Sequence, residues 1–451
     1  MATTYLSYTQ GAPTNNKKWT WSAWLKLGKT IGARYIMSSY VDANNATSIR
    51  ILDSTSSSRL DFQNYVSSSD AGRLKTTRYL RDPAAWYHIV CVFDSDNVTS
   101  GDRQQIWING VRETAFDTET YPSSGAASIL NASGIVAEVG RRSDSANMLN
   151  GELAHTHFCD GQAYSASDFG ETDATSGIWI PKSGPSVTYG NNGFFLKYSS
   201  GASGTDSSGN SNDFTVSGTM TNLKDSPDNN FCTLNPLDVN AFSGNQFVYS
   251  ECNNTVVPTG NNWKSTVSTM GNMTGKYYFE TKIIGSDTNW WVGIMDPSEV
   301  QYYSGSKKIT EYPRGYGITA GGDKGNNGSE VAWGTTSIAQ NDIICIAVDI
   351  TNSKIYARKN DDAWLVSGDP TSGATGTGSA FTLAQNGGNN INYVPAVSAY
   401  SVNSKLSCNF GAGYFGTTAV ASAGTNASEV GTFEFDVPTG YTAFSTKGLN
   451  I

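Results

Sequence analysis

One strand–turn–strand pattern occurs twice in this chain, and it limits the folds that the chain can adopt. The first copy occupies residues 86–110 and the second occupies residues 342–361. Each copy has an apolar run that ends at aspartate, a polar turn, and a second run that ends at asparagine and one further turn residue. Runs rich in β-branched and aromatic residues, bounded by Asp, Asn, Gly and Ser, are typical of half-buried antiparallel strands. The pattern therefore predicts two β-sandwiches in tandem.

The composition favours the same fold class. Only 15% of the residues are charged, whereas aromatic residues make up 12% and glycine occurs 47 times. No long stretch has the apolar spacing of three and four residues that an amphipathic helix requires. We therefore predict an all-β fold of two tandem antiparallel sandwiches of the jelly-roll kind, joined by an ordered, loop-rich connector.

Charge and cysteine usage exclude several classes of function. The formal net charge is −9 and no basic stripe occurs, which argues against nucleic-acid binding. The first residues have neither a basic region nor an apolar core, and no segment has the length of a membrane span, so we expect no signal peptide and no membrane insertion. The six cysteines lack paired CxxC spacing, and we expect buried free thiols in a protein that folds in a reducing cytoplasm.

The distribution of strands and turns divides the chain into four regions. We expect a first sandwich at residues 1–165, a connector at 166–240, a second sandwich at 241–418, and a linker with a C-terminal strand at 419–451. Aromatic residues are scattered through the connector, and disordered segments are depleted in them, so we expect it to be ordered. In the segment 19–25, strand alternation leads us to expect all three tryptophans on one face.

Two sets of short motifs follow one another in order along the chain. The first set lies at residues 21–25, 86–90, 107–110 and 139–154, and this region resembles the laminin-G/concanavalin A-like lectin family. The second set lies at residues 275–280, 291–294, 341–349, 354–360 and 408–411, and this region resembles a SPRY module. Both resemblances imply β-sandwiches of a kind that more often bind than catalyse.

Motifs in and around the connector form a third set. They lie at residues 158–163, 168–173, 177–182, 189–195, 206–213 and 435–441. Together they resemble virion proteins of tailed phages, especially marine ones, which carry the same pair of modules. The resemblance implies an exterior virion component, such as a fibre, that is assembled in the host cytoplasm with other virion proteins. By analogy with fibres it implies a homo-oligomer, with a trimer as the expected state.

We expect no enzymatic activity. Retaining glycoside hydrolysis needs two carboxylates about 5 Å apart, and laminarinase-type enzymes carry them as Glu-x-Asp-x-x-Glu. The nearest motifs, at residues 171–173 and 434–436, lack the third acid. His155 and His157 could bind a metal together with a carboxylate, but ordinary strand residues are favoured.

Calcium is the one cofactor that the sequence suggests. Asp206, Asn210 and Asp213 offer hard oxygen ligands within one turn, as do the aspartates of residues 94–102. Calcium is common in laminin-G-like domains, so the resemblance supports this site. The alternative is a turn rich in Asp and Asn that is capped by its own side chains.

Candidate ligand contacts lie in the second sandwich. Tryptophan rings can stack on the C–H faces of sugars. We expect Trp291 in the core, which would place Trp290 on the opposite face. Two long polar turns, at residues 321–328 and 385–390, add polar groups of the kind that loops at sandwich ends use for recognition. The candidates are Trp290, Trp333, Trp364, Asp323, Asn326 and Asn389.

These features predict an exterior structural protein of a tailed-phage virion that contacts the host surface. The partner would be a host cell-surface glycan or protein, and many linked copies would strengthen weak binding. Two alternatives stay open. One is a capsid decoration or collar protein without receptor binding, and the other is a polysaccharide depolymerase.

Overall fold

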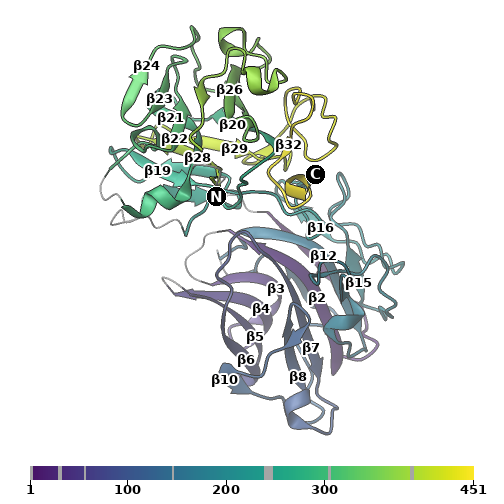
Figure 1. The fold of residues 1–451 in the computed structure, drawn as a ribbon. Coiled ribbons are helices and arrows are strands. Elements are labelled where there is room, and N and C mark those ends of the chain that lie inside the picture. Colours follow the sequence, from purple (N-terminus) through teal and green to yellow (C-terminus); the bar gives the residue numbers. More distant parts are fainter. Residues whose placement is uncertain are drawn as a thin grey trace. The chain divides into compact units, whose positions relative to one another are not determined.

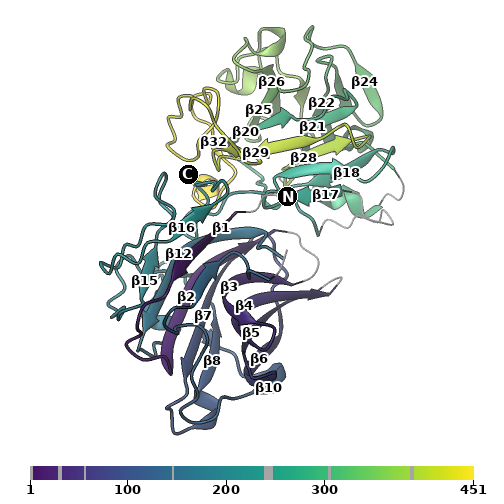
Figure 2. The same ribbon diagram turned by 180° about the vertical axis from the view of Figure 1, so that it is seen from behind.

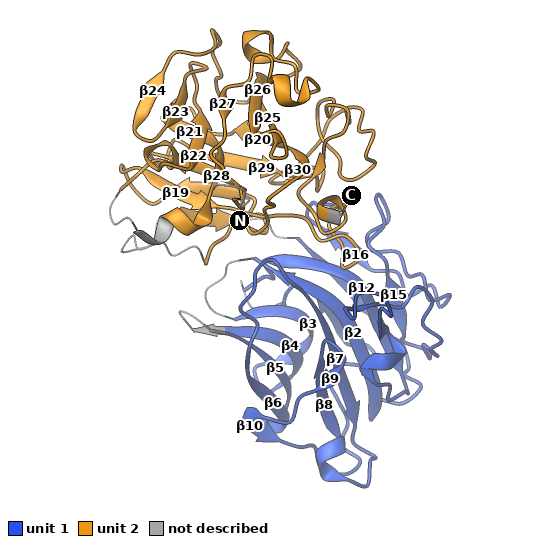
Figure 3. Ribbon diagram, in the orientation of Figure 1, with its two compact units in different colours: residues 1–222 blue, residues 223–451 orange. Residues whose placement is uncertain are grey.

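The chain is all-β, which confirms the predicted fold class (Figure 1). The computed structural model describes residues 4–28, 33–54, 57–144, 147–237, 247–302, 306–385 and 391–450. Two compact units divide the chain, residues 1–222 and 223–451 (Figure 3). Within the described ranges the only helical elements are short 3₁₀ turns, and none has the length and apolar composition needed to span a bilayer.

Unit 1 is built from two antiparallel sheets that pack face to face (Figures 1 and 2). Sheet 1A has the strand order β10 (Phe116–Thr120), β6 (Ser69–Tyr79), β5 (Ser57–Val66), β4 (Asn45–Ser54), β3 (Arg34–Asp42), β11 (Val136–Val139), β1 (Tyr5–Thr9) and β16 (Thr215–Ser217). Sheet 1B has the order β15 (Phe194–Leu196), β12 (Gly151–Asp160), β2 (Lys18–Leu27), β7 (Trp86–Asp94), β8 (Gln104–Ile108) and β9 (Val111–Arg112). Two 3₁₀ turns, η1 (Ser100–Asp102) and η2 (Ala166–Asp168), lie in the loops.

The two faces of β2 differ from the predicted arrangement. Trp19 and Trp21 lie in the core between the sheets, where Trp19 stacks on Phe93 with 5.7 Å between ring centroids. Trp24 lies on the other face and stacks on His88 at 4.9 Å. The expectation that all three tryptophans share a face is wrong, because position 24 is out of phase with positions 19 and 21 in a strand of period two.

The connector covers the outer face of sheet 1B. Its aromatic residues and the outward side chains of β7, β8 and β12 form one apolar cluster, with members such as Val92, Phe169 and Trp179. β13 (Gly170–Thr172) and β14 (Trp179–Pro181) pair as a small ribbon within it. The indole N–H of Trp179 donates to Nδ1 of His88 at 3.0 Å. Residues 166–222 therefore belong to unit 1. Their aromatic side chains cover the outer face of sheet 1B.

Unit 2 also contains two large sheets, which are antiparallel except for the parallel pairing of β20 (Lys276–Ile283) with β32 (Thr442–Ala443). Sheet 2A has the order β17 (Phe247–Ser250), β18 (Thr255–Pro258), β29 (Leu406–Asn409), β20 (Lys276–Ile283), β25 (Ile343–Asp349), β26 (Lys354–Lys359) and β27 (Phe381–Thr382), with β32 (Thr442–Ala443) also on β20. Sheet 2B has the order β19 (Lys264–Val267), β28 (Val394–Ala399), β21 (Trp290–Met295), β22 (Gly315–Ile318), β23 (Lys324–Asn326) and β24 (Ser329–Val331). The remaining elements are the pair β30 (Tyr414–Phe415) and β31 (Thr418–Ala419) and the 3₁₀ turns η3 (Pro297–Tyr302), η4 (Ile309–Glu311), η5 (Leu365–Ser367), η6 (Gly373–Thr375) and η7 (Gly448–Asn450).

The C-terminal segment covers the outer face of sheet 2A. Phe433, Val437 and Tyr441 pack with outward residues of β20, β25 and β26. The strand predicted near residues 432–438 is not a strand in the structure. Its backbone instead meets the buried carboxylate of Glu280, which accepts the N–H groups of residues 434 and 435 at 2.9 Å each. The side chain of Glu280 thus accepts backbone N–H groups that a neighbouring strand would accept in a sheet.

Both copies of the repeated motif are antiparallel hairpins, as predicted. The first is β7–β8 and the second is β25–β26. Each ends at an asparagine with positive φ, 49° at Asn109 and 48° at Asn360. The Asn109 side chain accepts the N–H of His88, and the Asn360 side chain accepts the N–H of Ile343, both at 2.8 Å. Asparagine tolerates this left-handed conformation, so it closes both hairpins.

Candidate functional site

Sheet 1A differs from the other three large sheets in what lies on its outer face. The connector covers sheet 1B, the C-terminal segment covers sheet 2A, and η4 with Tyr312 packs on Trp291 and Met295 of sheet 2B. None of the apolar clusters formed by the described residues covers the outer face of sheet 1A. Ser38 and Ser48 on this face are nevertheless buried, and Ser38 donates to the carbonyl of Arg141.

The side chains of β4 show how this face arises. Ile49 and Ile51 point into the core of unit 1, so strand alternation turns Ala46, Ser48 and Arg50 outward. The outward surface is polar because the sequence alternates apolar and polar residues along the strand. Such a surface can remain in contact with water without a covering layer.

A buried ion cluster fixes the centre of this face. Asp61 of β5 is 0% exposed; its Oδ2 accepts Nε of Arg50 at 2.8 Å and its Oδ1 accepts Nε of Arg73 at 2.9 Å. Arg50 also donates to Oε1 of Gln63 at 2.8 Å, and Gln63 donates to Asp70 at 2.5 Å. These contacts link β4, β5 and β6 and give the strands a rigid outer surface.

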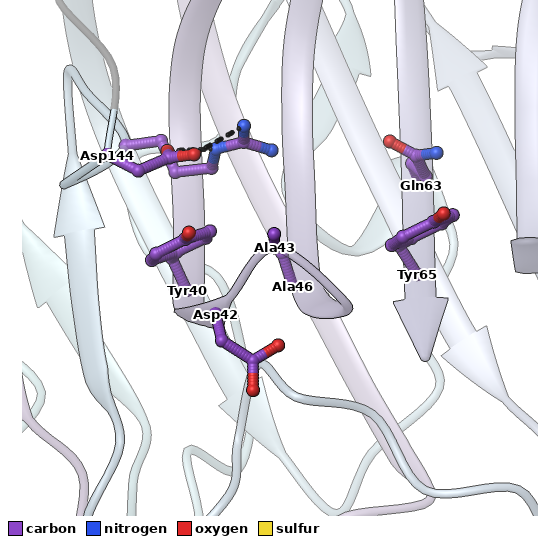
Figure 4. A pocket seen from close by; sticks show the side chains of 8 residues that line it. Tyr40, Asp42, Ala43, Ala46, Gln63, Tyr65 and Asp144 are labelled. Atoms are coloured by element: carbon purple, nitrogen blue, oxygen red, sulfur yellow. Dashed lines mark hydrogen bonds and ion pairs between the residues drawn. The ribbon is translucent and has the colours of Figure 1, made fainter. Parts of the chain in front are cut away.

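A hollow lies beside this cluster, at the β3–β4 turn (Figure 4). Tyr40 of β3 and Tyr65 of β5 both pair in register with Ala46 of β4. Neighbouring strands are about 4.8 Å apart, so the two tyrosine backbones are separated by roughly 10 Å. Only the methyl group of Ala46, which is 5% exposed, stands between them. The hollow has a volume of about 220 Å³.

Charged groups stand at the rim of the hollow. Arg142 donates from Nε and Nη2 to the two oxygens of Asp144, at 2.6 and 3.0 Å. Its guanidinium carbon lies 4.7 Å from the ring centre of Tyr35 and 5.3 Å from that of Tyr40. Asp42, at the end of β3, accepts the N–H of residue 44 at 2.7 Å. The hollow therefore combines two aromatic rings, which can pack on apolar groups, with carboxylates, which accept hydrogen bonds.

The tryptophan that we expected to be exposed is buried. Trp290 is 0% exposed and lies in the core between sheets 2A and 2B. The prediction that its ring is exposed is therefore wrong. Trp291 is buried as well, at 3%, on the opposite face beneath η4. Alternation holds on β21, but both faces of this strand are covered. Trp290 is consequently not open to a ligand.

The other expected contacts in unit 2 do not form one hollow. Trp333 packs partly buried against the core of the unit, whereas Trp364 packs on the covering cluster of sheet 2A and beneath the guanidinium of Arg358, at 5.0 Å. Asn326 donates its amide to two backbone carbonyls at 2.9 Å. Asp323 is half-buried, and its carbonyl accepts a backbone N–H. Asn389 lies outside the described residues.

The expected calcium turn is filled by hydrogen-bond donors. Oδ1 of Asp206 accepts the N–H groups of Phe195 and Ser208, both at 2.8 Å, and Oδ2 accepts the N–H of Asn212 at 3.0 Å. Asp213 accepts the N–H of residue 206, and the amide of Asn210 donates to carbonyls 190 and 193. These hydrogen bonds are those of the alternative, a turn capped by its own side chains. A cation would have to displace the N–H donors from the carboxylate oxygens. Calcium at this turn stays a prediction.

The two histidines of β12 are separated by a bulge between Ala154 and His157. His157 is buried against the ring of Phe195, 4.0 Å between centroids, and its Nδ1 lies 2.9 Å from the Tyr189 hydroxyl. Within the described part of the chain, no three His, Cys, Asp or Glu side chains are grouped to hold a metal. All six cysteines are free; five are buried, as predicted, whereas Cys252 is half-buried.

Sequence reasoning missed the hollow. Tyr40, Ala46 and Tyr65 lie on three different strands, and no motif marks them. The usable signal is alternation, because residues 59, 61, 63 and 65 of β5 are all polar or aromatic and must share the outer face. Which residues of β3 and β4 stand beside Tyr65 depends on register, which the sequence does not state.

Comparisons with known proteins support a lectin-like first unit. Residues 1–168 match a family model described as the concanavalin A-like lectin/glucanases superfamily. A search of the curated proteins finds no match. The solved structures to which the chain is similar include the human HERC1 SPRY domain (16% identity over 34% of this chain and 87% of that one, TM-score 0.26) and another human SPRY domain (18%, 36% and 94%, 0.27).

A third similar structure is a heptameric SAP-like pentraxin from Limulus polyphemus, with 18% identity over 37% of this chain and 73% of that one and a TM-score of 0.28. The family match confirms the resemblance of the first region. Residues 1–168, which lie within unit 1, thus match a family model for concanavalin A-like lectins and glucanases.

Proposed function

We propose that this chain is a carbohydrate-binding protein without enzymatic activity, and that its first unit binds sugar in the hollow between Tyr40 and Tyr65. The observation that carries the proposal is the row Tyr40–Ala46–Tyr65, which sets two rings on either side of a small floor residue. The match of residues 1–168 to a lectin-like family supports a sugar over other ligands.

The chemistry of the hollow suits a sugar ring. Sugars present apolar C–H faces that pack on aromatic rings, and hydroxyl groups that carboxylates accept. Tyr65 lies on β5, which the ion cluster around Asp61 links to β4 and β6. A preformed site needs little ordering on binding, which preserves affinity for a small ligand.

The biological setting that we propose is the exterior of a tailed-phage virion. Support comes from the resemblance of residues 158–213 and 435–441 to proteins of such virions. In that setting the hollow would contact a host surface glycan, and several copies in a homo-oligomer would add avidity to a weak single site. The protein would then reside in the virion beside other virion proteins.

A glycan array probed with the purified full chain tests the sugar-binding proposal. We expect binding to a restricted set of surface glycans, and no release of reducing ends from any glycan that binds. Absence of binding to every glycan contradicts the proposal and favours a purely structural role. Release of reducing ends would instead support a depolymerase.

The virion setting has its own test. A cryo-EM map of the virion would show unit 1 exposed on an appendage, with the outer face of sheet 1A open to solvent. A map with this face buried against the capsid would favour a decoration or collar protein.

A further inference from the structure

The charges around the hollow indicate which class of sugar it accepts, an inference that rests on the proposed sugar-binding role of the same hollow. Three charged side chains line it, Asp42, Arg142 and Asp144. Arg142 and Asp144 neutralise each other through two hydrogen bonds. Asp42 takes part in none of the ion pairs formed by the described residues; its Oδ1 accepts only the neutral donors of Asn44 and Asn45, at 2.7 and 3.0 Å. One negative charge at the hollow is therefore uncompensated.

The charges behind the hollow do not alter this balance. Gln63, which lines the hollow, contacts Arg50 on one side and Asp70 on the other. Arg50 and Arg73 are both paired with Asp61, and Arg73 also lies 3.4 Å from Asp70. The two cations and two anions of this cluster cancel, so the cluster offers no spare positive charge to an anionic ligand.

Arg142 is not free to serve an anion either. Its guanidinium lies over the rings of Tyr35 and Tyr40 while it binds Asp144. Turning toward a ligand carboxylate would break the ion pair and both ring contacts. Arg142, the one cation among the residues that line the hollow, is thus already paired with Asp144.

We propose that the hollow binds a single uncharged hexopyranose ring and rejects the corresponding hexuronic acid, with Asp42 as the residue that sets this specificity. The Asp42 carboxylate can accept hydrogen bonds from sugar hydroxyls, but it repels a carboxylate on the ligand. The size of the hollow, about 220 Å³, lies below the roughly 300–1,000 Å³ of pockets for drug-sized ligands, so we assign it a single ring.

The test uses sugar pairs that differ only at C6. Methyl glucoside is compared with methyl glucuronide, and the galactose and mannose pairs are treated alike, with the full chain as receptor and saturation-transfer NMR titration as the measurement. We expect at least one hexoside to bind and its uronide to bind at least about tenfold more weakly, because like charges at contact distance oppose binding. The ratio should shrink between about 0.05 and 0.5 M salt as screening grows.

Substitutions test whether Asp42 causes the difference in affinity between hexoside and uronide. In Asp42→Asn the uronide should approach the hexoside in affinity, to within about threefold, while the hexoside itself changes little. Asp117→Asn is the matched control: Asp117 lies on β10 of the same sheet, pairs with Arg59 and Lys75, and its loss changes the net charge equally. The control should keep the wild-type ratio.

Each outcome decides between the two proposals. A wild-type chain that binds hexoside and uronide equally, or an Asp42→Asn variant that keeps the ratio, overturns the inference and leaves sugar binding intact. Tighter binding of the 6-amino-6-deoxy glycosides than of the neutral hexosides also overturns it, in favour of a cationic ligand. If no sugar of any pair binds, the proposed function fails together with the inference.

Discussion

Tyr40 and Tyr65 lie opposite the same residue, Ala46, from either side of β4, and their side chains flank one hollow on the outer face of sheet 1A. The two tyrosines come from separate strands, so the hollow exists only when β3, β4 and β5 pair in this register. A one-residue slip would turn one ring into the core. The site and the stability of sheet 1A are therefore linked, and the expected effects of substitutions follow from that link.

Removal of one ring should weaken sugar binding and leave the fold intact. We expect Tyr65→Ala to lower the affinity for any glycan identified on the array by about fivefold, since an aromatic contact contributes roughly 1 kcal/mol. Titration of that glycan checks the effect. Tyr79→Ala serves as the control, because Tyr79 lies on the same sheet opposite Arg59, six residues along β5 or about 20 Å away. Equal losses in both variants would contradict the site.

Loss of the buried carboxylate should destabilise unit 1. Asp61→Asn leaves Arg50 and Arg73 without their shared anion, and breaking a buried pair costs about 3 kcal/mol. Urea unfolding checks this, with pulse labelling of the buried thiol of Cys91 as the reporter for unit 1. Asp117→Asn removes two ion pairs of a part-exposed carboxylate and should cost less than about 1 kcal/mol. A cost for Asp61→Asn no larger than that of the control would contradict a structural role for the cluster.

Acid should destabilise unit 1 through its buried histidines. Burial lowers the pKa of His88 to about 3, and burial also lowers the pKa of His157. Both side chains stay neutral in the folded state, whereas the unfolded chain takes up protons below about pH 6.5. The stability that the two neutral histidines contribute is therefore fully present above that pH. As the pH decreases further, this contribution is lost by up to about 1.4 kcal/mol per pH unit for each histidine. Urea midpoints of Cys91 labelling across this range measure the slope. His88→Gln should flatten it, and an unchanged slope would contradict the assignment.

Unit 2 should respond to pH in the opposite direction. Burial raises the pKa of Glu280 to about 7, against the lowering effect of its hydrogen bonds from residues 434 and 435. The folded state thus holds a proton between about pH 4.5 and 7 that the unfolded state releases. The stability from this group is full below about pH 4.5 and is lost as the pH rises through 7, by about 3 kcal/mol across the window. Labelling of buried Cys345 reports unit 2, and the same sign of change for both thiols would argue against this account.

The parts of the fold that depend on local pattern could be predicted from the sequence. Both hairpins of the repeated motif form where the apolar runs and their closing asparagines indicate, because Asn109 and Asn360 adopt the conformation that ends each hairpin. β6 (Ser69–Tyr79) was not predicted, since few of its residues are apolar. It pairs with β5 and β10, and Asp61 of β5 binds Arg73 across the first pair, a contact between strands that no single segment reveals.

The candidate site could not be predicted because burial and register are properties of the whole fold. Alternation on β21 separates Trp290 from Trp291 correctly, but η4 covers the second face, so neither ring is exposed. The acidic turn around Asp206 has the right ligand types, yet its oxygens face N–H donors of its own backbone. In each case a neighbouring segment, and not the residue type, determines what the side chain can do.

The most direct test of sugar binding in the hollow is to fill it. Ala46→Leu places a larger apolar side chain between the two tyrosines and changes neither charge nor backbone hydrogen bonding. On a glycan array probed with the full chain, the wild type should bind its glycans and Ala46→Leu should lose them, with Cys91 labelling in urea unchanged. A folded Ala46→Leu variant that keeps wild-type glycan binding would contradict the account and place recognition elsewhere on the protein.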